Sequence, residues 1–194
     1  GKEGHEFIVT RPETPRPWFN YLFNDVYHAL VSQTGGGYSY YKDPKYYRLL
    51  RYDHISTDRP GRYLFLKDRA TGDVWSANWQ PLRQELESWE CRHGLGYTTI
   101  TSTHKGIRAT ITYLVTQRDP VELWSVRLKN VGRRRRTVQA FPFVEFVAGE
   151  GEVVCARADA ISFVAPGVVE DRLARTAHGI CQADRRAKTI QVEE

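Results

Sequence analysis

The 194-residue sequence predicts an all-β fold, an antiparallel β-sandwich, from its alternating segments and from the turns between them. The clearest alternation lies in residues 107–115, where Ile111 and Tyr113 fall on one face and Thr110 and Thr112 on the other. This period of two is typical of a half-buried strand. Helical periodicity is not sustained before about residue 168, which argues against an α/β fold.

Further strands follow from the same signals. Segment 96–102 is expected to form a hairpin with the strand that follows it. Segments 121–129 and 137–146 are expected to form a second hairpin through the arginine-rich turn at 133–136, and Pro142 indicates an edge or a bulge. The other expected strands are 6–10, 27–32, 62–67 and 73–75, the last two joined by a turn at 68–72.

The residue pattern of the chain changes near residue 150. We expect residues 1–150 to form the sandwich and leave 151–194 unassigned, as the end of the sandwich or a divergent tail. Two short strands, 152–156 and 161–165, and a weak helix from residue 168 are compatible with that region. The sequence contains no methionine, so we expect it to be a piece of a longer or processed protein.

Charge and composition argue against nucleic acid and membrane as binding partners. The 28 basic and 23 acidic residues are interspersed, so the net charge of +5 predicts no extended polyanion-binding surface. The run Arg133–Arg136 is typical of a solvated turn rather than a nucleic-acid patch. No apolar run reaches the length of a membrane span, and three widely spaced cysteines predict a reducing, cytoplasmic location without a disulfide framework.

The stretch 33–44 places three consecutive glycines before a cluster of tyrosines. A nucleotide cradle needs a helix N-terminus after its glycines, and a P-loop also needs Gly-Lys-Ser/Thr. Here Gly35–Gly37 leads into a β-type run instead. We therefore expect a corner between strands that presents Tyr38 and Tyr41.

Candidate chemistry elsewhere is sparse. Cys91 and His93 would share a face of a strand, but no second pair stands at zinc-site spacing, so no metal is expected. Glu85, Glu87 and Glu90 are expected to form a solvated strand face, and no residue stands out as a catalytic acid.

Two loops, 48–62 and 75–81, are rich in groups that bind hydroxyls and anions. Arginine offers a planar fork, Asp58 can accept hydroxyl hydrogen bonds, and Trp75 and Trp79 offer ring faces for sugar C–H groups. The alternative for the Asp-Arg-Pro-Gly sequence at 58–61 is a simple turn, whose residue types it also fits. Both interpretations remain open.

Five motifs resemble one family, the cellobiose, cellodextrin and chitobiose phosphorylases of glycoside hydrolase family 94, which also includes cyclic β-glucan synthases. The likeness runs in order from about residue 6 to about residue 146. The motifs are TPRPWFNYL at 14–22, TGGGYSYYKDP at 34–44, RLLRY at 48–52, TDRPGRY at 57–63 and ECRHGLGYT at 90–98.

The resemblance implies the N-terminal super-sandwich of a larger inverting phosphorylase that acts on β-linked glucose or N-acetylglucosamine oligosaccharides. Inorganic phosphate would be the co-substrate, with no other cofactor. The general acid, an Asp, would lie in an (α/α)6 barrel outside this chain, so no catalytic residue is assigned, and a homodimer is expected. The residues expected to face the sugar are Tyr38, Tyr41, Asp58, Arg59, Trp79, Arg92 and His93.

The sequence departs from the family after Val144-Glu-Phe146, where cellobiose-type members carry a segment ending in a Gln-Arg pair near the acceptor sugar. That contact is not carried over to this chain. Two other hypotheses remain: a stand-alone carbohydrate-binding module without catalytic activity, and a basic nucleic-acid-binding domain based on Arg133–Arg136.

Overall fold

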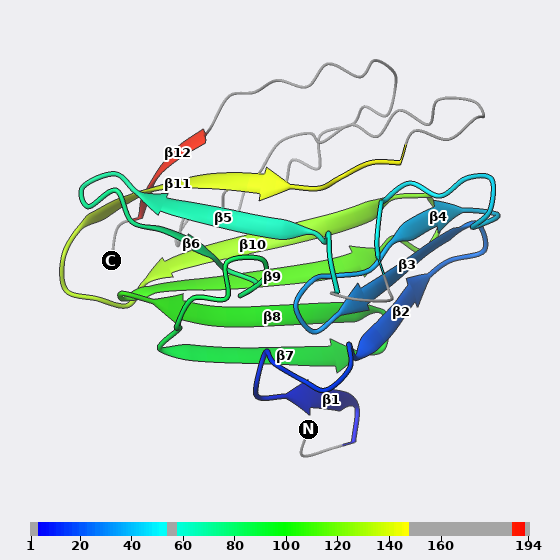
Figure 1. The fold of residues 1–194 in the computed structure, drawn as a ribbon, viewed down its shortest axis with the longest axis horizontal. Helices are drawn as coiled ribbons and strands as arrows, with labels where there is room; N and C mark the ends of the chain where they lie inside the picture. Colours follow the sequence, from blue (N-terminus) through cyan, green and yellow to red (C-terminus); the bar gives the residue numbers. More distant parts are fainter. Residues whose placement is uncertain (1–3, 54–57, 148–187, 193–194) are drawn as a thin grey trace.

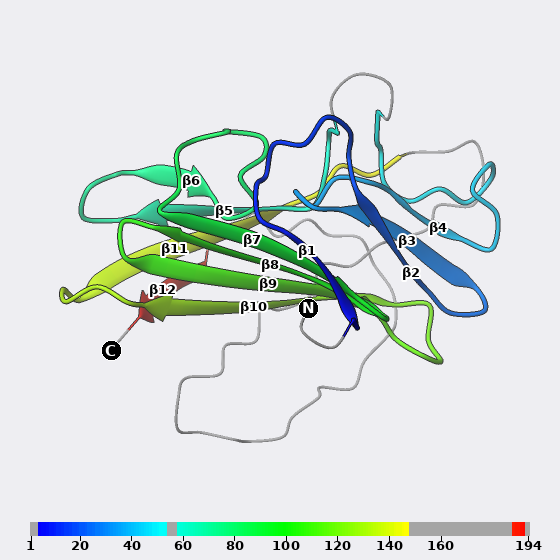
Figure 2. The ribbon, with the colours of Figure 1, turned by 90° about the horizontal axis from the view of Figure 1, so that it is seen from below.

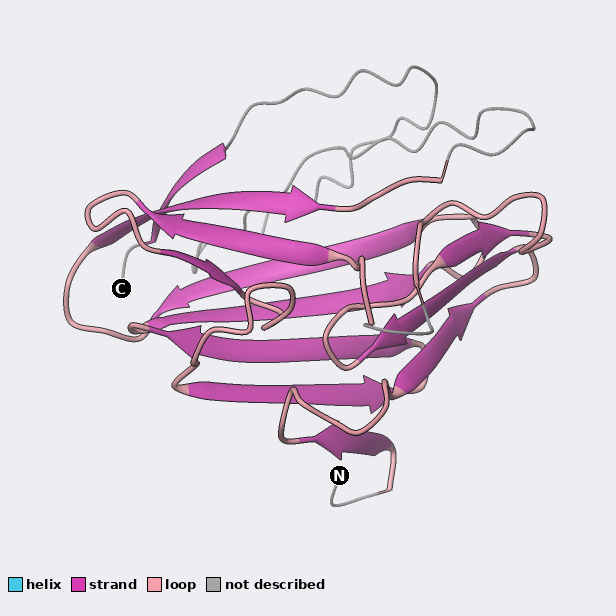
Figure 3. Cartoon of the chain, viewed as in Figure 1, coloured by secondary structure: helices cyan, strands magenta, loops and turns pink. Residues whose placement is uncertain are grey.

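The computed structural model describes residues 4–53, 58–147 and 188–192, and all regular structure there is β-strand (Figures 1 and 3). The strands pair antiparallel in three sheets, which confirms the predicted all-β fold. The five-stranded sheet has the order β1 (Glu6–Val9), β7 (Ser88–Gly94), β8 (Tyr97–His104), β9 (Ile107–Val115), β10 (Glu122–Asn130). The four-stranded sheet has the order β12 (Lys188–Val192), β11 (Arg136–Phe143), β5 (Tyr63–Asp68), β6 (Val74–Ser76), and the three-stranded sheet β2 (Phe19–Phe23), β3 (Tyr27–Ser32), β4 (Ser39–Tyr41).

Alternation predicted several strands well. β9 and β3 have the predicted bounds, and β8 and β9 form the predicted hairpin with Ile100 opposite Ile111. β2 and β12 were not predicted. Two expected strands, 152–156 and 161–165, lie outside the described residues, and the boundary near 150 stays a prediction.

The predicted hairpin between β10 and β11 is wrong. β10 pairs with β9, whereas β11 pairs with β5 and β12 in another sheet. The arginine-rich segment is a corner that carries the chain between sheets: the backbone N–H groups of Val131 and Gly132 donate to the Gly106 carbonyl, at 2.8 and 3.2 Å. At the far side of the corner, Arg136 forms an ion pair with the buried Asp68 of β5.

Within the described residues, Pro142 lies where β11 has a paired strand on one side only. It stands opposite Leu64 of β5, while β12 pairs with β11 only as far as Ala140. A residue without a backbone N–H is tolerated at such an edge, as the sequence predicted.

The core lies between the sheets (Figure 2). It consists of residues from all three, because the inward positions of strands such as β3, β5 and β9 are apolar. Its most buried members include Leu22, Val31, Leu66, Trp75, Cys91, Ile100, Ile111, Tyr113 and Val138.

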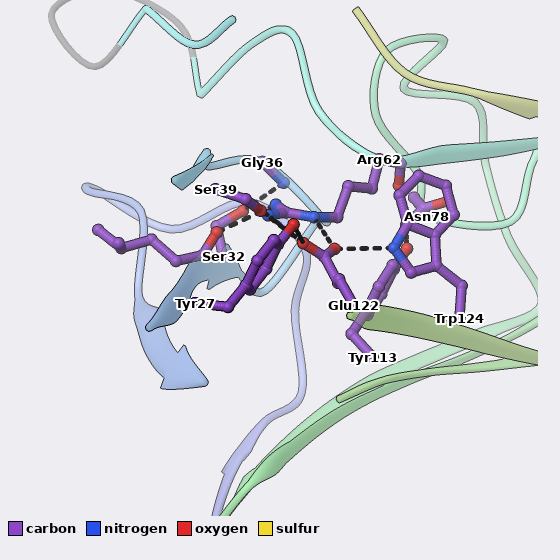
Figure 4. A network of polar contacts seen from close by, with 10 residues as sticks. Tyr27, Ser32, Gly36, Ser39, Arg62, Asn78, Tyr113, Glu122 and Trp124 are labelled. Carbon is purple, nitrogen blue, oxygen red and sulfur yellow. Dashed lines mark hydrogen bonds and ion pairs between the residues drawn. The ribbon is translucent and has the colours of Figure 1, made fainter. Parts of the chain in front are cut away.

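One buried ion pair connects the three sheets (Figure 4). The Arg62 side chain, directly before β5, is fully buried and binds Glu122 at the start of β10. Its guanidinium also donates to the Leu30 carbonyl of β3 at 3.0 Å and to Ser39 Oγ of β4 at 2.6 Å. Trp124 Nε1 donates to Glu122 at 2.7 Å, so both charges are well satisfied.

Replacing Glu122 by Gln should destabilise the fold by about 3–5 kcal/mol, because it leaves the Arg62 charge buried without its counter-ion. Urea unfolding followed by circular dichroism measures this. The matched control is Glu145→Gln, which breaks the exposed Arg51–Glu145 pair and should cost about 0–1 kcal/mol. Equal losses in the two variants would contradict the structural role of the buried pair.

The stability contribution of Glu122 should depend on pH. Burial alone raises the pKa of this carboxyl, but the Arg62 charge and the hydrogen bonds outweigh burial and hold the pKa below its usual range. Because the folded-state pKa is lowered, the contribution is present above the unfolded-state value of about 4.3 and is lost as the pH falls through the folded-state value. The difference in unfolding free energy between wild type and Glu122→Gln should therefore shrink from about pH 6 to pH 3; a constant difference would contradict this.

Candidate functional site

The seven sequence-predicted site residues lie in three separate places. Tyr38 and Tyr41 lie at the three-stranded sheet, Asp58, Arg59 and Trp79 in two loops, and Arg92 and His93 on β7. Tyr52 contacts both Tyr38 and Asp58, whereas no contact among the described residues joins Arg92 or His93 to the other five. Their contact with a sugar stays a prediction, and what each touches within the protein is described below.

The glycine stretch is a closed corner. Residues 31–37 are all buried, and a side chain at Gly36 would place its Cβ 2.0 Å from Asp58 Oδ1. At Gly37, where φ is +109°, a Cβ would lie 2.1 Å from the Leu30 carbonyl oxygen. The glycines are needed because neighbouring groups pack directly on their backbone.

Asp58 lies beneath this corner, 9% exposed and with a φ of 46°. Its carboxylate accepts hydrogen bonds from Ser32 Oγ at 2.8 Å, Thr34 Oγ1 at 2.7 Å and Tyr52 OH at 2.9 Å. Burial raises the pKa of Asp58, and the three hydroxyl donors act against it. Asp58 thus accepts hydroxyl hydrogen bonds, as its side chain suggested, but from the protein itself.

The two predicted tyrosines are half-buried. The Arg48 guanidinium lies 4.3 Å from the Tyr38 ring centroid, and the Tyr52 ring centroid lies 6.4 Å away with the two planes 29° apart. Tyr41 meets the Tyr47 ring edge-on at 6.4 Å. Ring faces that other side chains cover offer little area to a ligand.

The two predicted loop residues, Arg59 and Trp79, lie in the segments before β5 and after β6, which project to the same side of the molecule (Figure 2). Arg59 is exposed. Trp79 is half-buried, with a φ of 79° and the Arg83 guanidinium 5.5 Å from its ring. Trp75, in contrast, is 1% exposed in the core and offers no face to solvent.

Arg92 and His93 point to opposite faces of β7. Arg92 is partly exposed and forms ion pairs with Glu6 at 2.8 Å and Glu90 at 2.5 Å. His93 is 9% exposed on the inner face beside Cys91, a free buried thiol. Among the described residues, no group of three or more His, Cys, Asp or Glu side chains is placed to hold a metal ion. The same residues include no helix long and apolar enough to cross a membrane.

His93 holds the backbone of Trp18. Its Nε2 lies 3.1 Å from the Trp18 carbonyl oxygen, which can only accept, so Nε2 carries the proton and Nδ1 accepts from Thr98 Oγ1 at 3.0 Å. Burial lowers the pKa of His93, against the opposing effect of its bond to Trp18. The neutral imidazole is therefore a positioning group.

Trp18, whose backbone His93 holds, is the most exposed tryptophan of the chain. Its ring stacks on Phe7 of β1, with centroids 4.8 Å apart and planes 14° apart, yet 46% of Trp18 remains exposed. One hollow beside the ring is lined by Pro15, Arg16 and Pro17. A second, of about 340 Å³, lies on the Phe7 side and is lined by His5, Phe7, Trp18, Phe19, Asn20, His93, Gly94 and Leu95. We call Phe7, residues 15–17 and Trp18 the Trp18 platform.

Gln33, the residue just before the glycine corner, fixes this platform. It is 3% exposed, its Oε1 accepts from Trp18 N–H at 2.8 Å, and its own N–H donates to the Trp18 carbonyl at 3.1 Å. Its Nε2 donates to the Pro12 carbonyl at 3.1 Å and to Thr14 Oγ1 at 2.8 Å. The glycine corner therefore serves the platform indirectly, by setting the position of Gln33.

Sequence reasoning did not single out Trp18 as a site residue. The sequence feature that could have indicated it is an aromatic residue between a proline-rich segment and a strand that was not predicted, β2. Proline fixes the backbone of such a segment and makes exposed aromatic residues there rigid. The partners Gln33 and His93 are far away in sequence, so the pattern alone could not reveal them.

Replacing Gly36 by Ala should destabilise the fold by about 1–3 kcal/mol or more, because the new methyl group overlaps Asp58. Thermal and urea unfolding measure the loss. The control is Gly132→Ala, where the nearest atom to a Cβ is 3.4 Å away, and a much smaller change is expected. A Gly36→Ala protein as stable as the control would show that the corner is open after all.

The family comparison agrees with this fold. The model of the glycosyl hydrolase 94 supersandwich domain matches residues 5–178. An N,N'-diacetylchitobiose phosphorylase of Vibrio furnissii is 39% identical over 147 residues, which cover 74% of this chain and 18% of the relative. A 3-O-β-D-glucopyranosyl-β-D-glucuronide phosphorylase of Paenibacillus borealis is 41% identical over 139 residues, 72% of this chain and 17% of the relative.

A more distant relative is the cyclic β-(1,2)-glucan synthase of Rhizobium meliloti (strain 1021), 27% identical over 152 residues, 76% of this chain and 5% of that protein. The chain spans less than a fifth of the length of these curated relatives. It belongs to the glycosyl hydrolase 94 family and corresponds to its supersandwich domain.

Proposed function

We propose that this chain acts as the N-terminal supersandwich of an inverting β-glycoside phosphorylase and is inactive on its own. The observation that carries the proposal is its identity of 36–41% to phosphorylases of three different β-glycosides or related disaccharides over about three quarters of its length. Those relatives are more than five times longer than the matched segment. The catalytic groups would belong to the part that this chain does not match.

The surface supports a domain that other parts of an enzyme cover. Large apolar side chains are exposed in several regions: Tyr21 and Phe23 on β2, Leu95 in the β7–β8 turn, and Phe141 and Phe143 on β11. Such extensive apolar exposure is typical of surfaces that meet another domain or subunit. An (α/α)6 catalytic domain and a second subunit in a homodimer are the partners we propose.

The proposed reaction needs a proton donor that the two hollows around Trp18 lack. Phosphate oxygen would bond to the anomeric carbon, the glycosidic C–O bond would break, and one carboxylic acid would give its proton to the leaving oxygen. Neither hollow is lined by Asp or Glu. The proposal therefore places the general acid in the catalytic domain, with phosphate as co-substrate, no other cofactor and a cytoplasmic location.

The second candidate is a stand-alone carbohydrate-binding module. The observation that favours it is the exposed, rigidly held ring of Trp18. The two candidates differ in what an added catalytic domain does: a phosphorylase domain restores turnover, whereas a free-standing module gains nothing from it.

The isolated chain should release no sugar 1-phosphate from N,N'-diacetylchitobiose or cellobiose in the presence of phosphate. The assay follows sugar 1-phosphate by chromatography, with the intact Vibrio furnissii relative as the positive control. A chimera in which this chain replaces the matched segment of that relative should be active, whereas the relative without the segment should not. Turnover by the isolated chain, or a well-folded but inactive chimera, would overturn the proposal.

A further inference from the structure

The Trp18 ring has one face without a ring partner. Phe7 stacks on the other face, no second aromatic ring stacks on Trp18 among the described residues, and 46% of the residue is exposed. The hollow lined by Pro15, Arg16 and Pro17 adjoins the ring. Two of its lining residues are prolines, whose short rings leave room for a flat ligand against the indole.

Two unused donors border this face. Neither the exposed Arg16 guanidinium nor the Trp18 indole N–H forms a hydrogen bond with another described residue. Arginine presents its donors in a fixed planar fork. A ring face with hydrogen-bond donors beside it is complementary to a molecule that has a C–H face and an oxygen-bearing edge.

The platform is fixed before any ligand arrives. Gln33 and His93 together make three hydrogen bonds to the Trp18 backbone, and Thr14 Oγ1 donates to the Arg16 carbonyl at 2.6 Å. Three prolines limit the remaining backbone freedom of residues 12–18, the arm that carries Trp18. An aromatic group held in this way loses little conformational entropy on binding.

A second exposed aromatic surface differs in this respect. On the three-stranded sheet, His28 stacks between Phe23 and Tyr40 with ring centroids 5.8 and 4.7 Å apart. Phe23, at the end of the row, is 66% exposed, but its side chain has no hydrogen-bond donor. Trp18 combines an exposed ring with a hollow and two polar donors, and this combination is what points to a ligand.

We propose that the Trp18 platform binds one pyranose ring of a β-linked oligosaccharide, with the sugar C–H face on Trp18 and its hydroxyl oxygens toward Arg16. In a glucose-type pyranose the hydroxyls are equatorial, so the axial C–H bonds form a flat apolar face. The choice of β-linked glucose-type sugars rests on the proposed function. The stack and the donors rest on the structure alone.

The test follows the tryptophan indole N–H signals of the ¹⁵N-labelled chain by NMR during titration with N,N'-diacetylchitobiose and with cellobiose. The Trp18 signal, assigned by its loss in Trp18→Phe, should shift saturably, with a Kd on the order of millimolar. The signal of the core residue Trp75 should not move. Mannitol, which has hydroxyls but no pyranose face, should have no effect.

Variants assign the binding to named groups. Trp18→Ala should weaken binding at least tenfold and Arg16→Ala several-fold, read from backbone amides of residues 14–20. The matched control, Tyr21→Ala, removes another exposed aromatic ring, 63% exposed, and should leave the Kd unchanged. Arg16 is exposed and unpaired within the described residues, so its variant keeps the test valid even if Trp18→Ala loosens the arm.

Four results would overturn the proposal: no shift of the Trp18 signal at saturating sugar, unchanged affinity in Trp18→Ala and Arg16→Ala, an equal response to inorganic phosphate alone, or concentration-dependent broadening of Trp18 without sugar. The third would indicate an anion site and the fourth a protein interface. None of them affects the assignment to the phosphorylase, which the chimera tests separately. Conversely, an inactive chimera leaves the titration result as it stands.

Discussion

The contact between Arg62 and Glu122 holds three sheets in one arrangement. Glu122 belongs to the five-stranded sheet, Arg62 directly precedes β5 of the four-stranded sheet, and the guanidinium also binds a carbonyl and a hydroxyl of the three-stranded sheet. A buried charge is costly unless its geometry is well satisfied. Any sliding of one sheet over another would break these bonds, so the pair selects one register among the many that apolar packing alone would permit.

This register determines where the glycine corner lies. Arg62 N–H donates to the Gly35 carbonyl at 2.8 Å, and Gly36 pairs with Gly61 in an isolated bridge. The corner in turn closes over Asp58 and sets Gln33, which fixes the arm carrying Trp18. The buried Arg62–Glu122 pair is thus connected to the exposed Trp18 ring through a short series of hydrogen bonds and close contacts.

Local pattern predicted much of the fold. β3 and β9 were found because alternation is a property of neighbouring residues, and the family could be recognised from contiguous motifs. The predicted hairpin between β10 and β11 was wrong because the corner between them depends on a contact with Gly106, well before it in the sequence. The sequence predicted that Asp58 accepts hydrogen bonds from hydroxyl groups and that His93 shares a strand face with Cys91. It could not predict their partners, because Ser32 and Trp18 lie 26 and 75 residues away. Burial of Arg62 depends on Glu122 in the same way, and no local pattern reveals it.

The order of strands in the five-stranded sheet bears on how the chain assembles. β7, β8, β9 and β10 are consecutive in sequence and adjacent in space, joined by short connections. β1 joins the same sheet from far away in the sequence, and Asn20 of β2 reaches the β7–β8 turn across 74 residues. Contacts that close short loops form fastest. The meander β7–β10 is therefore expected to be the template of folding, and the N-terminal segment that carries Trp18 is expected to dock onto it late.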